Sequence, residues 1–155
     1  MWFWLVMAAV GASVVYAFRT HQDERRHLLQ VLRAISGDRG GTIDPGSALY
    51  LPSLKFEANT AKWLIGGMAT DGSPGSSSFT FLNVEMQQGG EFIDDWRQVL
   101  AGQQQLSAAQ QRGVSVNVEG SVVRLHRDGI ARSRAEIDEL VEIAELLVST
   151  CRRAH

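Results

Sequence analysis

The chain has 155 residues, of which 45% are hydrophobic and 21% charged, a composition typical of one folded domain and not of a disordered chain. Its formal net charge of −2 creates no broad basic field, so nucleic acid is not an expected partner. The single cysteine, Cys151, excludes an intramolecular disulfide and a cysteine-rich zinc site.

The first segment of the chain, residues 1–18, is almost entirely apolar. Only Gly11 and Ser13 fall outside the apolar residue types, and every formally charged side chain lies from Arg19 onward. As a helix this segment is about 25 Å long at about 1.5 Å per residue, slightly shorter than a hydrocarbon core of about 30 Å. The segment is therefore just long enough to span a bilayer.

Aromatic side chains stand at both ends of this segment, where the two headgroup regions of a bilayer would lie. They form a predicted transmembrane anchor together with the first charged residue, and the set is Trp2, Trp4, Tyr16, Phe18 and Arg19. Two alternatives are a cleaved secretory signal and a helix buried within the fold. The signal is disfavoured because no Lys or Arg precedes the apolar run.

The arginines that follow the anchor predict its orientation, because positively charged flanks stay on the cytoplasmic side. They are Arg19, Arg25, Arg26 and Arg33. We therefore expect a single-pass protein whose soluble part is cytoplasmic and whose first partner is the lipid bilayer. Small residues at four-residue spacing, such as Ala8 and Ala12, would also allow self-association of the span, although an alanine-rich span is the simpler interpretation.

Residues 19–37 are predicted to continue as a juxtamembrane helix. Leu28, Leu32 and Ile35 recur at helical spacing. Glycines at 37, 40 and 41 and the Asp-Pro-Gly sequence at 44–46 then predict a loop. The expected organisation is an anchor over 1–18, this helix, and a single α+β domain over 38–155.

Strand patterns dominate the first half of that domain. Residues 49–56 and 61–68 predict a hairpin that turns at Asn59, with Pro52 at an edge or at a strand start. The polar stretch 70–78 predicts a loop, and residues 79–86 predict a third strand. In this strand apolar residues occur on both phases, so either both faces are covered or a bulge shifts the register.

Helical and strand patterns alternate in the second half. Residues 92–100 place apolar side chains on one helical face, and residues 103–112 fit a helix or a loop. Residues 114–118 and 122–127 alternate as the two strands of a second hairpin. The predicted fold class is thus α+β, with about five antiparallel strands packed against a long C-terminal helix.

That C-terminal helix has the clearest pattern in the soluble part. Ser133 and Glu136 have the spacing of a capping box at its start. Apolar residues then follow at helical spacing, namely Ile137, Leu140, Val141, Ala144, Leu147, Val148 and Cys151. We expect the sheet to cover this stripe. The alternative is that a protein partner covers it, with Leu140 and Leu147 as the contact surface.

The search for reactive motifs predicts no catalytic residue, cofactor site or metal site. The sequence Asp-Gly-Ser-Pro-Gly at 71–75 lacks the first glycine of a nucleophile elbow, and no phosphate-binding glycine loop occurs. His21 and His27 do not share a helix face and are expected on a solvated juxtamembrane surface. His126 is expected to be exposed, and Cys151 to be buried on the apolar stripe.

Two functional hypotheses remain. The first is a membrane-anchored, non-catalytic module that binds a protein partner or assembles with itself. The second is an enzyme, such as a hydrolase, whose site is assembled from distant residues near the loop Ser73–Ser78. A deep pocket with Asp, Glu or His near that loop would favour the enzyme, whereas an exposed apolar patch on the sheet would favour binding.

Overall fold

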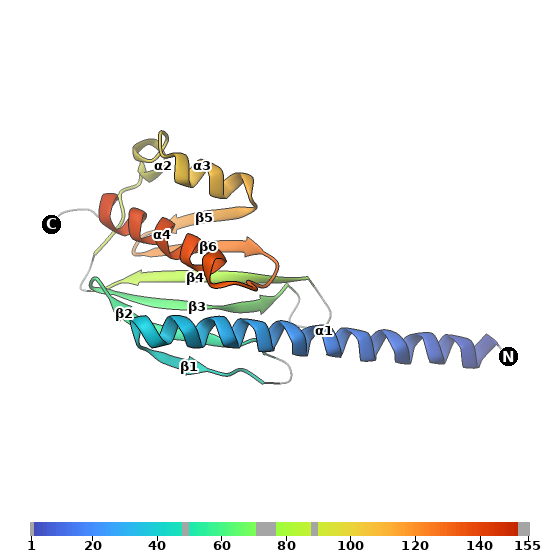
Figure 1. Ribbon diagram of the computed structural model, residues 1–155. Coiled ribbons are helices and arrows are strands. Elements are labelled where there is room, and N and C mark those ends of the chain that lie inside the picture. The colour runs from blue at the N-terminus through green and yellow to red at the C-terminus, as the bar shows by residue number, and fades with distance from the viewer. Residues whose placement is uncertain (1, 48–49, 71–76, 88–89, 152–155) are drawn as a thin grey trace.

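The computed structural model describes residues 2–47, 50–70, 77–87 and 90–151, without the side chain of Phe3. Its helices and strands follow one another in an α+β arrangement (Figure 1). In chain order they are α1 (Trp2–Arg39), β1 (Thr42–Asp44), β2 (Ser53–Ala58), β3 (Ala61–Ala69), β4 (Ser78–Met86), α2 (Trp96–Val99), α3 (Gln104–Gln111), β5 (Val114–Glu119), β6 (Val122–Asp128) and α4 (Arg134–Thr150).

The strands form one antiparallel sheet in the order β1-β2-β3-β4-β6-β5. The predicted α+β class is therefore confirmed, with six strands in place of about five. The additional strand is β1, which has three residues and a single apolar side chain, Ile43. Because β1 is this short and lies between glycines and Pro45, its sequence had predicted a loop.

Both predicted hairpins are present. The turn between β2 and β3 places Asn59 and Thr60 at φ of 53° and 60°, the left-handed backbone that Asn tolerates well. Strand β2 starts directly after Pro52, later than predicted, which leaves the proline outside the paired residues. The hairpin of β5 and β6 turns at Gly120, with φ of 56°.

Three helices cover one face of the sheet, and α3 among them packs against β5 and α4 (Figure 1). The second half of α1 lies over β2 and β3, and α4 lies over β4 and β6. The core between them contains fully buried side chains from every layer, including Leu28, Leu32, Trp63, Leu82, Leu125, Leu140 and Leu147. The predicted packing of the C-terminal stripe against the sheet is confirmed, and so is the capping box of Ser133 and Glu136.

The structure explains why strand β4 has apolar residues on both of its faces. Its pairing with β3 runs without interruption from Ala61 opposite Met86 to Ala69 opposite Ser78, so no bulge shifts the register. Phe81 points to the face that the helices leave uncovered and is still only 8% exposed. Gly66 makes room for it, since a Cβ there would lie 3.0 Å from the Phe81 ring.

The predicted helix over residues 92–100 is mostly wrong, because α2 contains only Trp96–Val99. The backbone N–H groups before α2 form hydrogen bonds with other parts of the chain. The N–H of Phe92 donates to the carbonyl of Gly120 at 3.0 Å, and the N–H of Ile93 donates to the carbonyl of Cys151 at 2.9 Å. The ambiguous segment after it is a helix, α3.

Helix α1 is continuous across the predicted boundary at residue 18 and projects far beyond the end of the sheet (Figure 1). The connection between β6 and α4 lies at the same end of the molecule as this projection. The molecule thus has a globular body, a single projecting helical segment, and a junction where the two meet.

Candidate functional site: the projecting half of helix α1 and its junction with the domain

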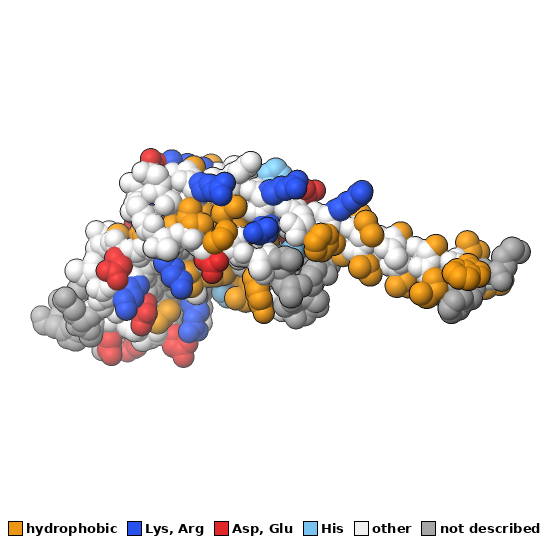
Figure 2. Space-filling model, turned by 90° about the horizontal axis from the view of Figure 1, so that it is seen from below, with side chains coloured by type: hydrophobic (Ala, Val, Ile, Leu, Met, Phe, Trp, Pro, Cys, Tyr) orange, Lys and Arg blue, Asp and Glu red, His pale blue; other side chains and the backbone are white. Residues whose placement is uncertain are grey.

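The projecting half of α1 exposes most of the large apolar side chains that the described residues leave in solvent. Of thirteen such side chains, ten lie there: Trp2, Trp4, Leu5, Val6, Met7, Val10, Val14, Val15, Tyr16 and Phe18. Figure 2 shows hydrophobic side chains along the outer part of this helix, where no charged side chain is seen. No other described element exposes apolar surface on this scale.

The predicted anchor residues are all on this surface. Trp2 and Trp4 are 83% and 75% exposed near the tip, and Tyr16 and Phe18 are 74% and 47% exposed near the body. Arg19 follows them and is also exposed. The alternative of a helix buried within the fold is therefore wrong. Over the described residues, no helix combines the length and the sustained apolarity required to cross a membrane, so the predicted transmembrane span over residues 1–18 is not supported.

Two hydroxyl side chains of the projecting half form hydrogen bonds within the helix. The Ser13 hydroxyl donates to the carbonyl of Ala9 at 2.9 Å, and the Thr20 hydroxyl donates to the carbonyl of Tyr16 at 3.1 Å. Such bonds to the preceding turn satisfy the donors of these two hydroxyls. The surface of this segment is thus mainly apolar, and Tyr16 adds an exposed phenol at its inner end.

The junction begins at His21, which the structure places differently from the sequence expectation. This side chain is 2% exposed, so it is buried and not on a solvated surface. Its Nε2 atom has no hydrogen-bond partner among the described residues. A cavity of about 580 Å³ adjoins it on α1, between Ala12 and Glu24. His27, in contrast, is exposed as expected.

Two side-chain bonds fix α1 to the body just beyond His21. The Ser78 hydroxyl at the start of β4 donates to the Glu24 carboxylate at 3.0 Å. The Arg25 guanidinium donates to the carbonyl of Pro45 at 3.1 Å. Deeper in, Gly67 permits close packing, since a Cβ there would lie 2.8 Å from Leu28 and 3.0 Å from Ile130. These contacts set the direction in which the projecting half leaves the domain.

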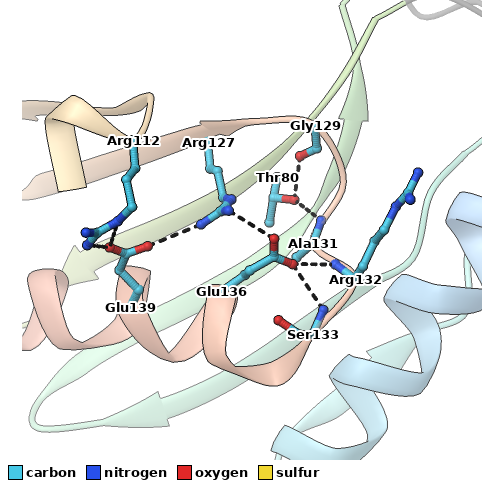
Figure 3. A network of polar contacts seen from close by, with 9 residues as sticks. All are labelled: Thr80, Arg112, Arg127, Gly129, Ala131, Arg132, Ser133, Glu136 and Glu139. Atoms are coloured by element: carbon cyan, nitrogen blue, oxygen red, sulfur yellow. Dashed lines mark hydrogen bonds and ion pairs between the residues drawn. The ribbon is translucent and has the colours of Figure 1, made fainter. Parts of the chain in front are cut away.

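The polar network of Figure 3 holds the connection between β6 and α4 beside this junction. The hydroxyl of Thr80, which is fully buried, donates to the carbonyl of Gly129 at 3.0 Å and accepts from the N–H of Ala131 at 2.8 Å. The Glu136 carboxylate accepts from the N–H of Arg132 at 2.7 Å and from that of Ser133 at 3.1 Å. The backbone from 129 to 133 is thereby fixed at four points.

Glu136 also receives a charged partner. The Arg127 guanidinium donates to its second oxygen at 2.9 Å and to Glu139 at 3.2 Å, and Arg112 contacts Glu139 as well. Burial raises the pKa of Glu136, but the two backbone donors and the charge of Arg127 outweigh that effect. The net pKa of Glu136 is lower than its ordinary value, so the carboxylate is ionised at neutral pH.

The uncovered face of the sheet carries a separate shallow groove of about 610 Å³. Its walls combine Leu64 and Val122 with charged side chains of both signs, among them Lys55, Lys62, Arg124, Glu57 and Glu85. Asn83 lines this groove, and its Oδ1 atom has no hydrogen-bond partner in the part of the chain that the structure describes. The face is therefore amphipathic and offers both apolar contact and hydrogen bonding.

The remaining predicted site residues lie as follows. Leu140 and Leu147 are both 0% exposed, so neither is available as a partner surface in this structure. Of the loop proposed for an enzyme site, residues 73–76 lie outside the described residues, and the Ser78 hydroxyl is bonded to Glu24. Cys151 is buried as expected, and burial raises the pKa of its thiol. His126 is exposed, with its ring centroid 5.3 Å from that of Phe79.

Among the described residues, no group of three or more His, Cys, Asp or Glu side chains is arranged to hold a metal ion. Comparison of the chain with protein-family models, with curated proteins and with solved structures found no match.

Proposed function

We propose that this chain is a membrane-attached, non-catalytic binding or assembly module whose attachment is the projecting half of α1. The observation that carries the proposal is the concentration of ten exposed large apolar side chains on one segment that packs against nothing else in the described structure. Burying one such side chain contributes about 1.5–3 kcal/mol. Ten of them left in water forgo on the order of 10 kcal/mol, which a lipid environment would recover.

The chemistry along the segment supports lipid as the environment. Aromatic side chains stand at both ends, as they do at the two interfaces of membrane-embedded helices, and the hydroxyls of Ser13 and Thr20 are bonded internally. The first charged side chain, Arg19, follows directly on the apolar surface. The arginines beyond the segment favour a cytoplasmic position of the globular domain. A reporter that requires the cytoplasm, fused after His155, is then expected to be active.

The globular domain would serve as the binding part of the module. The amphipathic groove on the uncovered face of its sheet has charges of both signs around Leu64 and Val122. A surface of this kind suits a protein partner better than a small polar substrate, which requires an enclosed site. The membrane segment would concentrate this surface at the bilayer.

Vesicle flotation of the full chain tests the attachment. Val10 lies near the middle of the projecting half and is 53% exposed, and Val99 in α2 is 46% exposed and serves as the matched control. An aspartate at the centre of a membrane segment costs about 2.5–3.5 kcal/mol. We expect the wild-type chain and Val99→Asp to float with phosphatidylcholine vesicles, and Val10→Asp to be depleted from them. Equal flotation of both variants, or none of the wild type, would contradict the proposal.

A further inference from the structure

A second groove lies at the junction, between α1 and the connection from β6 to α4. It has a volume of about 540 Å³. The residues that matter for its chemistry are Tyr16, Arg19, Asp23, Glu24 and Arg132. We propose that this groove binds the phosphate group of a phospholipid headgroup, an inference that rests on the proposed membrane attachment.

The two arginines supply the recognition. Within the described part of the chain, neither the Arg19 nor the Arg132 guanidinium has a hydrogen bond or an ion pair, although both line the same groove. In Figure 3 the Arg132 side chain extends away from the carboxylate of Glu136, which holds only its backbone N–H. Arginine presents paired N–H donors that match phosphate oxygens. Two unpaired guanidiniums in one groove thus provide a phosphate site.

Both arginines project from fixed supports. Arg19 lies on a continuous helix that Glu24 and Arg25 bond to the body. Arg132 lies in the connection whose backbone is held by Thr80 and Glu136. A site on such supports binds with a smaller loss of conformational entropy than one on a free loop.

The carboxylates in the groove already have partners. Glu24 accepts from the Ser78 hydroxyl at 3.0 Å, and the Asp23 carboxylate lies 4.0 Å from the exposed guanidinium of Arg26. They reduce the positive potential of the groove but do not neutralise Arg19 or Arg132 by direct contact. The groove thus contains two carboxylates and two guanidiniums. Attraction of a phosphate therefore depends on short-range contact with the guanidiniums and not on a long-range field.

The position of the groove identifies a lipid as the source of the phosphate. Arg19 directly follows Phe18, and Tyr16, which is 74% exposed, lines the groove on the side of the projecting half. A headgroup in this groove would therefore continue into acyl chains that lie against the apolar surface of α1. A soluble phosphate ester would make no use of that surface.

Native mass spectrometry of the full chain in nonionic detergent tests this site. The chain is offered phosphatidylglycerol and diacylglycerol with the same acyl chains, which differ in the phosphate headgroup. One arginine near an anionic headgroup contributes about fivefold in affinity, since about 1 kcal/mol corresponds to that factor. We expect the wild type to retain phosphatidylglycerol about 25-fold more strongly, and Arg19→Gln/Arg132→Gln to lose this preference.

Two further variants serve as controls. Arg33→Gln/Arg97→Gln removes the same charge from two exposed positions outside the groove and is expected to keep the preference. Arg19→Lys/Arg132→Lys keeps the charge and is expected to retain part of the preference. Loss of the preference in the Arg33 and Arg97 variant as well would overturn the site, because general charge would then explain binding.

The remaining outcomes separate this inference from the proposed function. If the wild type retains both lipids equally, the membrane attachment stands and the phosphate site is wrong. If it retains neither lipid, the attachment itself is wrong. Displacement of phosphatidylglycerol by millimolar glycerol phosphate would contradict a lipid headgroup as the ligand and identify a site for soluble phosphate esters.

Discussion

Glu136 shows how one side chain organises several parts of this molecule. Its carboxylate closes the capping box of α4, bonds the backbone of Arg132 and faces the Arg127 guanidinium. The sequence spacing of Ser133 and Glu136 was sufficient to predict the cap. The partnership with Arg127 was not predictable, because it depends on which strand lies under the start of the helix.

We predict that Glu136→Gln lowers the stability of the fold by about 1–2 kcal/mol at neutral pH, since the lost bonds involve a charged acceptor. The folded-state pKa of Glu136 is lower than its ordinary value of 4.5. The contribution of the ionised carboxylate to the free energy of unfolding is therefore complete above pH 4.5. The contribution decreases as the pH falls through the lower folded-state pKa.

Urea denaturation at several pH values measures this effect. The matched control is Glu142→Gln on the same helix, at an exposed position. The stability difference between wild type and Glu136→Gln is expected to narrow in acid, whereas Glu142→Gln should stay close to wild type throughout. A difference for Glu136→Gln that is independent of pH would show that the charge of this carboxylate is unimportant.

The histidines mark the limit of prediction at this scale. His126 lies beside Arg124 and Arg127 on a predicted strand, and its predicted exposure is confirmed. His21 lies in a run of polar residues that suggested solvent, yet it is 2% exposed. Burial of a single side chain at a junction depends on what the rest of the chain places beside it, and no local pattern contains that information.

At the scale of elements, α4 is the part that the sequence predicted best. Its apolar stripe, its cap and its packing against the sheet all follow from helical periodicity and from the need to cover apolar strand faces. Leu140 and Leu147 are 0% exposed in consequence. The alternative use of these two side chains by a partner would require the sheet to lose its cover.

We therefore predict that Leu140→Ala costs roughly 2–5 kcal/mol through lost burial and the cavity that remains. Leu146, on the same helix but only partly buried, provides the control, and Leu146→Ala should cost clearly less. Chemical denaturation midpoints of the full chain in detergent measure both. Equal midpoints for Leu140→Ala and wild type would show that the core packing described for α4 is incorrect.

The sequence patterns gave a wrong prediction for two elements, and the reasons are opposite. Strand β1 is too short to show periodicity and exists because the edge of β2 offers it pairing partners. The residues before α2 have helical periodicity, but their backbone groups bond to Gly120 and Cys151 instead. In both cases contacts between distant parts of the chain determined the local structure.

For the whole molecule, local patterns predicted the hairpins but not their order in the sheet. The chain leaves β4, passes through α2 and α3, and returns so that β6 and not β5 pairs with β4. Nothing in either strand specifies that choice. The continuity of α1 was expected from the leucine spacing, but the projection of its first half from the body was seen only in the structure.

The same continuity links the two proposals. Because one helix carries both the apolar surface and Arg19, insertion of its first half would fix the level of the junction groove at the membrane interface. The globular body would then be held at a defined height, with its uncovered sheet face directed along the membrane. Attachment in lipid is the central claim on which this arrangement depends.

Fluorescence quenching by lipids with brominated acyl chains tests that claim most directly. Trp2 and Trp4 lie in the projecting half, whereas Trp63 and Trp96 are buried in the body at 1% and 5% exposure. In reconstituted vesicles of the full chain, we predict that brominated lipids quench part of the tryptophan emission and that Trp2→Phe/Trp4→Phe abolishes this part. Emission of the full chain that brominated lipids leave unchanged, or quenching that persists in Trp2→Phe/Trp4→Phe, would contradict the account.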